Sequence, residues 1–185
     1  VGESLASMIL SLLPEKFILR QYDLGGVKVD FAVKLPASGR ILPIDSKFVL
    51  PESITKVAEE APEGVLAILR PEEIKEMNKI VIDRAKEISR KYIRPDKGTT
   101  DFAVMFIPDI VYANLRLEIW NQLKELKVIP AGTAMLLSLV FLVEQQDLLV
   151  RVSEAANKLW SILTMMENEI NNICKTLETA EKQNR

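Results

Sequence analysis

Histidine is absent from this 185-residue chain, and cysteine occurs only once, at Cys174. The lack of histidine excludes Ser–His and Cys–His nucleophilic catalysis and histidine-ligated zinc, and one cysteine cannot form an internal disulfide. A charge excess is lacking too, because 24 basic and 26 acidic residues give a net charge of -2. Any catalysis would therefore have to use carboxylates, lysine and hard metal ions. Any surface that binds nucleic acid must be a local cluster of basic residues, since the whole chain has no basic excess.

Long apolar runs are also lacking. The longest, at residues 131–143, is far shorter than the roughly 20 residues that cross a bilayer, and no basic segment precedes an apolar one at the start. We therefore expect this segment to make no membrane contact and to be cytoplasmic. The chain opens directly on helical sequence at Val1, which is compatible with a longer protein that has an upstream membrane anchor.

Hydrophobic spacing and turn residues predict an α/β chain. Helices are expected at residues 2–13, 72–92 and 111–126, followed by an apolar helix that ends at residue 143, and strands at residues 17–22, 27–34, 41–48, 101–107 and 128–129. The proline-punctuated stretch 51–71 is expected to be irregular. Three consecutive strands predict that the sheet begins antiparallel.

A periodic apolar seam follows the predicted α/β region. Its members alternate spacings of three and four and are Leu149, Val152, Ala156, Leu159, Leu163, Met166, Ile170, Ile173, Leu177 and Ala180. This spacing is typical of a coiled coil, which predicts a homo-oligomer or a docking rod; an ordinary long helix packed on its own domain is the alternative. We expect two domains, residues 1–146 and 147–185.

Two aspartates and a lysine lie near the ends of neighbouring predicted strands. Side chains two apart on a strand point the same way, so Asp45 and Lys47 share a face, roughly 6 to 7 Å apart. If the turn between the strands closes symmetrically, Lys34 pairs with Ile41, which places Asp30 opposite Asp45. The same register gathers an apolar set on the other face, which supports it because a one-residue slip would expose that set. The set is Phe31, Val33, Leu42 and Ile44.

Opposed carboxylates repel unless a cation lies between them or one is protonated. Hard oxygen ligands suit Mg²⁺ or Mn²⁺, which can share their coordination shell with a phosphate. The metal would polarise a phosphoryl oxygen, while Lys47 would orient the nucleophile or neutralise developing charge. Glu3, in the first predicted helix, could complete the outer shell. By itself the D-x-K pattern is also typical of solvated strand ends.

Five stretches resemble the RmuC family of DNA recombination proteins, within the PD-(D/E)xK nuclease-like superfamily. They are GE at 2–3, VDFAVKLP at 29–36, LPIDSKF at 42–48, KYI at 91–93 and TDFAVMFIP at 100–108. The resemblance covers approximately residues 2–143.

The resemblance implies a restriction-endonuclease-like core of order αβββαβ, a mixed sheet flanked by helices, with a long C-terminal helical arm. The superfamily's metal-site residues map onto Glu3, Asp30 and Asp45 as metal ligands and Lys47 as the residue that serves the attacking water. The implied activity is Mg²⁺- or Mn²⁺-dependent hydrolysis of DNA phosphodiesters in recombination and in limiting rearrangement. Val29 replaces the superfamily's proline, and Asp109 follows its strand sooner than the family's acid does.

A local basic cluster occupies residues 84–97, where six basic against two acidic residues give a balance of +4. This cluster predicts phosphate contacts, with Arg84, Arg90, Lys91 and Arg94 as candidate DNA ligands. The alternative is the solvated face of an amphipathic helix.

Two functions from different classes are compatible with the residues. The first is a metal-dependent deoxyribonuclease. The second is a non-catalytic DNA-binding or scaffold module that keeps the fold and assembles through its arm, since fold alone does not establish activity. A purely structural coiled-coil protein is disfavoured by the organised strand region.

Overall fold

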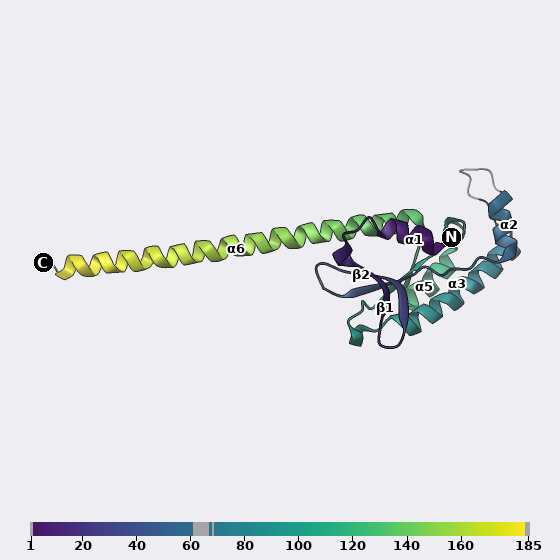
Figure 1. Ribbon diagram of the computed structural model, residues 1–185, viewed down its shortest axis with the longest axis horizontal. Coiled ribbons are helices and arrows are strands. Elements are labelled where there is room, and N and C mark those ends of the chain that lie inside the picture. The colour runs from purple at the N-terminus through teal and green to yellow at the C-terminus, as the bar shows by residue number, and fades with distance from the viewer. Residues whose placement is uncertain (1, 61–66, 68, 184–185) are drawn as a thin grey trace. The chain divides into compact units, whose positions relative to one another are not determined.

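The computed structural model describes residues 2–60, 67 and 69–183 (Figure 1). The elements are α1 (Gly2–Leu10), η1 (Glu15–Phe17), β1 (Ile18–Asp23), β2 (Lys28–Lys34), β3 (Ile41–Asp45), α2 (Glu52–Glu60), α3 (Pro71–Tyr92), η2 (Pro95–Lys97), β4 (Ala103–Phe106), α4 (Asp109–Ala113), α5 (Leu117–Glu125), β5 (Val128–Ala131) and α6 (Thr133–Gln183). The chain divides into two compact units, Val1–Glu144 and Gln145–Arg185. The division into domains at residues 1–146 and 147–185 stays a prediction.

The first unit is built on a five-stranded mixed sheet of order β1-β2-β3-β4-β5. The pairs β1–β2 and β2–β3 are antiparallel, which confirms the expected antiparallel start, and β3–β4 and β4–β5 are parallel. Parallel neighbours need a crossover connection. The crossovers are supplied by α2 and α3 before β4, and by α4 and α5 before β5.

The β2–β3 hairpin has the register expected from the sequence. Lys34 pairs with Ile41 and Phe31 with Ile44, and the turn is closed by a hydrogen bond from the Leu35 amide to the Arg40 carbonyl oxygen of 2.9 Å. The predicted apolar set is buried in a single cluster, which explains why this register is favoured over a slipped one. Asp30 and Asp45 lie one position beyond the pair Phe31–Ile44, at the end of the hairpin away from the turn.

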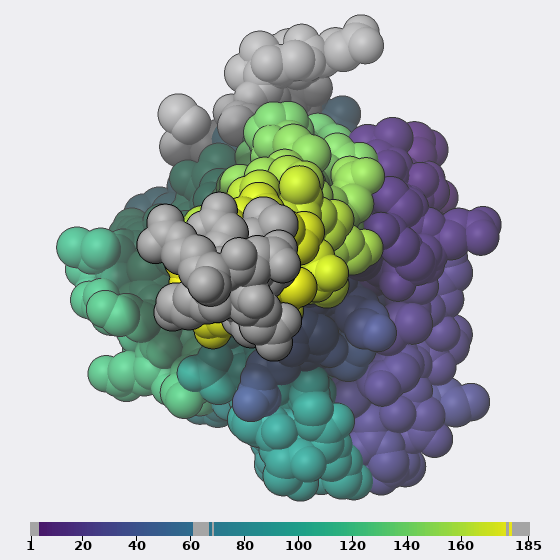
Figure 2. All heavy atoms as spheres, turned by 90° about the vertical axis from the view of Figure 1, so that its left-hand side faces the viewer, coloured from purple at the N-terminus to yellow at the C-terminus, as the bar shows by residue number. Residues whose placement is uncertain are grey.

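Helices cover both faces of the sheet, so the unit has three layers. On one face, α1 and the first turns of α6 pack against β2 and β3, for example through Leu10, Leu136 and Val140. On the other face, α3 and α5 pack against β4, for example through Met77 and Leu123. Figure 2 shows the N-terminal residues of this unit, in purple, as one continuous flank.

The edge strand β5 contains a proline, Pro130. The Ala103 amide donates to the Lys127 carbonyl oxygen and the Ile107 amide to that of Ala131, at 3.0 and 2.9 Å. Backbone groups alternate sides along a strand, so the nitrogen of Pro130 faces away from β4.

Several predicted boundaries are wrong. The helix expected at residues 111–126 is two helices, α4 and α5. Asn114 lies between them and donates from Nδ2 to the carbonyl oxygens of Ile110 and Ala67, at 2.8 and 3.2 Å. Its side chain thus competes with the continuing helix for backbone groups, as asparagine commonly does.

The stretch expected to be irregular contains α2, which begins directly after Pro51, a residue that suits a helix start. The strands β3 and β4 end earlier than predicted, at Asp45 and Phe106, and α1 ends at Leu10 instead of residue 13. The apolar helix and the arm are one helix, α6, because residues 144–148 contain neither glycine nor proline to end it.

Candidate active site

The hairpin buries two carboxylates in the interior of the first unit. Asp30, on β2, is 5% exposed and Asp45, the last residue of β3, is 1% exposed. A buried charge is costly unless it is paired or holds a metal, so the partners of these two acids decide what the site can do.

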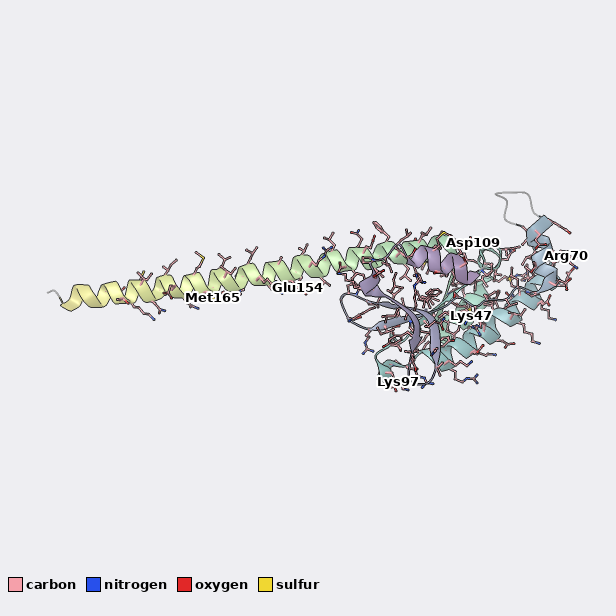
Figure 3. The ribbon with its side chains drawn as sticks, in the orientation of Figure 1. Lys47, Arg70, Lys97, Asp109, Glu154 and Met165 are labelled. Atoms are coloured by element: carbon pink, nitrogen blue, oxygen red, sulfur yellow. The ribbon has the colours of Figure 1, made fainter. Side chains whose placement is uncertain are left out.

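Asp30 is paired with the predicted lysine. The Nζ atom of Lys47 lies 2.7 Å from Asp30 Oδ1. The lysine, labelled in Figure 3, has a side chain that is 55% exposed. Gln21 donates weakly to the same oxygen at 3.5 Å. The other oxygen, Asp30 Oδ2, is buried and has no hydrogen-bond partner among the described residues. The lysine that shares a strand with Asp45 therefore contacts the acid of the neighbouring strand.

Asp45 is held by an arginine from α3. Arg84 donates from Nε to Asp45 Oδ1 at 3.1 Å and from Nη2 to Oδ2 at 2.6 Å, a two-bond arrangement. Burial raises the pKa of the Asp45 carboxyl above its ordinary value of 3.8, Arg84 opposes this rise, and the negative charge of Asp30 adds to it. The influence of Asp30 on Asp45 means that the two carboxylates share one electrostatic environment.

A chain of ion pairs continues along α3. Arg84 Nη1 lies 2.7 Å from Glu87 Oε2, and the other oxygen of Glu87 pairs with Lys91 one turn further on. The hydrogen bond from Lys91 is the main cause that lowers the pKa of Glu87. Burial raises the pKa of Tyr92, and the Asp45 charge adds to this rise. The cluster thus balances buried acids with cations of the chain itself.

The four candidate DNA ligands differ in their surroundings. Arg84 and Lys91 take part in the ion pairs just described, whereas Arg90 is exposed on α3 and Arg94 is half-buried after its end. Contact of these residues with DNA stays a prediction. The link from Arg84 to Asp45 was missed by sequence reasoning, although the spacing of Arg84, Glu87 and Lys91 is that of one helix face.

The fourth predicted site residue, Glu3, lies in α1, but its side chain is outside the described residues. Within the described part of the chain, no group of three or more His, Cys, Asp or Glu side chains is arranged to hold a metal ion. Of the predicted metal ligands, the side chains of Asp30 and Asp45 are described.

Asp109 has a structural role at the start of α6. Its Oδ1 accepts a hydrogen bond of 2.7 Å from the Thr133 amide, one of the helix's free N–H groups. A Cβ atom at the preceding Gly132 would approach that oxygen to 2.5 Å, so a larger residue there would displace the Asp109 side chain.

We expect Asp109→Ala to lower the free energy of unfolding by about 1 kcal/mol, the usual loss when a capping side chain is removed. Asp109→Asn keeps the acceptor and should retain most of this stability, as measured by chemical denaturation. If the asparagine variant instead stays folded but loses metal binding, Asp109 belongs to the metal site and not only to the helix cap.

One hollow, of about 500 Å³, is lined by Leu5, Ser46, Phe48, Val49, Leu50, Thr55, Phe106, Pro108, Asp109 and Thr133. Ser46 follows Asp45 directly, and its buried hydroxyl has no partner among the described residues. Asp30, Asp45 and Lys47 are not among its lining residues.

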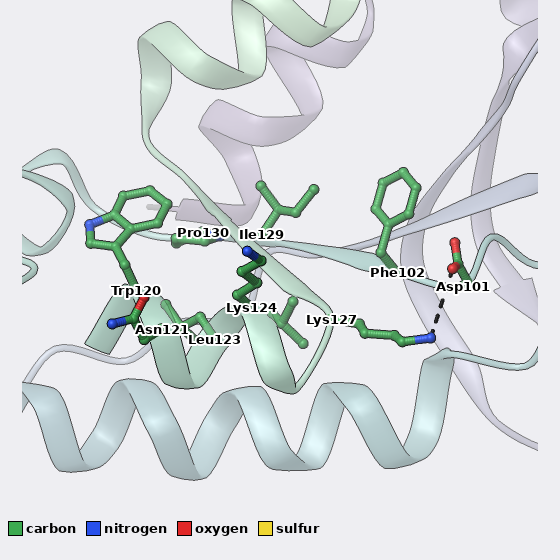
Figure 4. A pocket seen from close by; sticks show the side chains of 10 residues that line it. Asp101, Phe102, Trp120, Asn121, Leu123, Lys124, Lys127, Ile129 and Pro130 are labelled. Atoms are coloured by element: carbon green, nitrogen blue, oxygen red, sulfur yellow. Dashed lines mark ion pairs between the residues drawn. The ribbon is translucent and has the colours of Figure 1, made fainter. Parts of the chain in front are cut away.

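The second hollow, of about 460 Å³, lies where β4 and β5 begin. Figure 4 shows Trp120 and Phe102 on its two sides and Lys127 paired with Asp101, an N–O distance of 3.8 Å. It contains none of the predicted site residues, so it is separate from the acid cluster.

Comparison with known proteins places the chain in a family. The sequence model described as "RmuC family" matches residues 10–185, which include Asp30, Asp45 and Lys47 but not Glu3. Neither the search of curated proteins nor that of solved structures returned a match. The family match supports a role in DNA recombination. Because it covers nearly the whole sequence, the chain belongs to the RmuC family of DNA recombination proteins.

Proposed function

We propose that this chain is a metal-dependent nuclease that hydrolyses DNA phosphodiesters. The observation that carries the proposal is the pair of buried carboxylates beside Lys47, with Asp30 Oδ2 lacking a partner among the described residues. An ionised oxygen buried without a partner is costly, and a bound cation would relieve that cost. The family's role in DNA recombination makes a DNA phosphate the natural substrate group.

The described donors fit a hard divalent cation. Asp30 and Asp45 would hold Mg²⁺ or Mn²⁺, and Glu3 would add a ligand from α1. An ionised carboxylate offers about four lone-pair directions, so the two bonds from Arg84 still leave acceptor capacity on Asp45. Magnesium usually takes only one or two protein carboxylates and completes its shell with waters and phosphate oxygens.

Residues of the chain would take separate roles in hydrolysis. When bound, the cation polarises a phosphoryl oxygen and lowers the pKa of coordinated water. Lys47 reaches from solvent to Asp30, a position from which its ammonium group orients the attacking water or neutralises charge on the phosphate. Arg84 favours the ionised form of Asp45, which is the form that binds metal.

The order of elements supports the same proposal. The sequence α1, β1 to β3, α3 and β4 follows the αβββαβ order of a restriction-endonuclease-like core, with α2 as an addition. Asp45 lies at the end of β3, the position at which the αβββαβ order places a metal-binding acid. We propose DNA as the partner and the cytoplasm as the place of action.

A non-catalytic DNA-binding scaffold is the second candidate. It is favoured by the two bonds from Arg84, which already neutralise Asp45, and by the lack of a three-acid group among the described residues. Metal dependence distinguishes the two candidates. A scaffold should bind DNA in the presence of a chelator and should not cleave DNA whichever divalent ion is added.

Calorimetric titration with Mn²⁺ tests the metal site. We expect Asp30→Asn to weaken Mn²⁺ binding by roughly 10- to 100-fold or more, since it removes a charged ligand while its amide oxygen can still accept from Lys47. The matched control is Asp101→Asn, an acid whose side chain is 71% exposed and lies outside the cluster. Equal Mn²⁺ affinity of the wild type and Asp30→Asn would show that Asp30 is not a metal ligand and would contradict the proposed metal site.

A further inference from the structure

The second unit leaves a long apolar surface on a helix. Eleven large apolar side chains between Leu148 and Ile173 are 46% to 73% exposed. The side chains of this part of α6, among them the labelled Met165, project outward along its length (Figure 3). Soluble monomers rarely expose contiguous apolar patches of more than a few hundred Å², so a surface of this kind marks an interaction site.

The exposed residues follow a heptad repeat. Counting Leu149 as position a places Leu163 and Ile170 at a, and Leu159, Met166 and Ile173 at d. The opposite f positions are all polar, namely Glu154, Ser161, Asn168 and Lys175. A seam that repeats every seven residues matches the knobs-into-holes surface of another helix with the same repeat.

A lipid bilayer matches this surface less well. The stretch Thr133–Thr176 is long and apolar enough to cross a membrane by length and composition, although polar residues interrupt it. However, residues 145–178 contain three basic and five acidic residues. Charges repeated along the helix oppose a membrane-spanning position, and the acidic balance opposes binding at an anionic membrane surface.

The seam is large enough for a stable interface. If each of the ten side chains at a, d, e and g positions loses about 70 Å² of accessible surface, roughly 700 Å² is buried on each helix, near the size of a standard protein interface. Flanking residues widen the seam, because Leu148 and Ile162 occupy g positions and Trp160 an e position. A partner helix would cover these residues as well as the a and d positions.

We propose that the seam of residues 148–173 binds the same seam of a second copy of this chain, so that the protein assembles through a coiled coil. A second copy presents the complementary surface by definition, with the same heptad spacing and length. The proposal is independent of metal binding and of cleavage, and either can fail without affecting the other.

Sedimentation of the full chain tests the assembly. The wild type should sediment as an oligomer at micromolar concentration. The variant Leu163→Glu should raise the dissociation constant more than 100-fold, because it places a charge in the seam. The control Ser161→Glu adds the same charge on the polar f face and should leave the mass unchanged. A monomeric wild type, or a Leu163→Glu variant with unchanged mass, would overturn the proposal.

A spectroscopic measurement covers the case in which Leu163→Glu disturbs the helix itself. In a Trp120→Phe background the remaining tryptophan is Trp160, which is 73% exposed in the single chain. Its emission should shift to shorter wavelength as concentration rises, since the partner helix covers the ring. No shift over the range in which the mass changes would contradict the seam. Flotation of monomeric protein with phospholipid vesicles would identify a membrane as the occupant and also overturn the proposal.

Discussion

Replacement of Asp45 by asparagine should reduce Mg²⁺-dependent nicking of plasmid or branched DNA by at least about 100-fold. The amide keeps the size of the carboxylate and an oxygen that accepts from Arg84, so the strand end and α3 stay in place. It removes the negative charge that would hold the cation beside Lys47. The measurement is initial cleavage rate against Mg²⁺ concentration, because a lost ligand should not be fully rescued by saturating metal.

Two comparisons make the result for Asp45 decisive. Asp83→Asn changes an acid on α3 whose side chain is 61% exposed, and it should cleave like the wild type. Asp45→Asn should lose some stability, because its amide NH2 meets one of the two Arg84 donors, but it should still unfold in one cooperative transition, which separates chemistry from folding. Undiminished cleavage by folded Asp45→Asn would refute the assignment of this residue as a metal ligand. A wild type that binds DNA but does not cleave it with any divalent ion would favour the scaffold.

The second large effect concerns stability. We expect Arg84→Ala to lower the free energy of unfolding at pH 7 by about 2 to 4 kcal/mol, because it leaves Asp45, 1% exposed, as a buried charge without its partner. The measurement is urea unfolding at several pH values. Lys86→Ala, two residues away on the same helix with a side chain 63% exposed, should change stability by less than about 0.5 kcal/mol.

The pH dependence follows from the pKa of Asp45. Burial raises this pKa in the folded protein, so the folded state binds the proton more tightly than the unfolded state does. Stability therefore falls as pH rises from the ordinary value of 3.8 through the raised pKa. Without Arg84 the pKa rises further, and the loss in Arg84→Ala should be larger at pH 7 than at pH 4. A loss that is independent of pH would mean that packing by the arginine stem, not its charge, stabilises the fold.

The paired aspartates illustrate what a sequence can predict about a site. The hairpin register follows from two local facts, a short turn and an apolar set with period two, and both are visible between Phe31 and Ile44. A slip would have exposed that set, so the set fixes the register and, with it, the positions of Asp30 and Asp45 one residue beyond the pair Phe31–Ile44.

The partner of Asp45 depends on facts that are not local. Arg84 lies 39 residues further along the chain, and its contact depends on how α3 packs across the sheet. Helical spacing placed Arg84 on a basic face but gave no indication of which face meets the strands. The break between α4 and α5 was missed for a related reason, since Asn114 ends a helix through contacts with Ala67 that no periodic pattern indicates.

The proline in the edge strand limits how the molecule can aggregate. A strand added beside β5 would need a backbone N–H donor at position 130. Pro130 has no N–H group and cannot donate this hydrogen bond. Edge strands that lack such donors resist joining with the sheets of neighbouring molecules. At protein concentrations high enough for the α6 helices of two molecules to associate, the β5 edges of their sheets should therefore still not pair with each other.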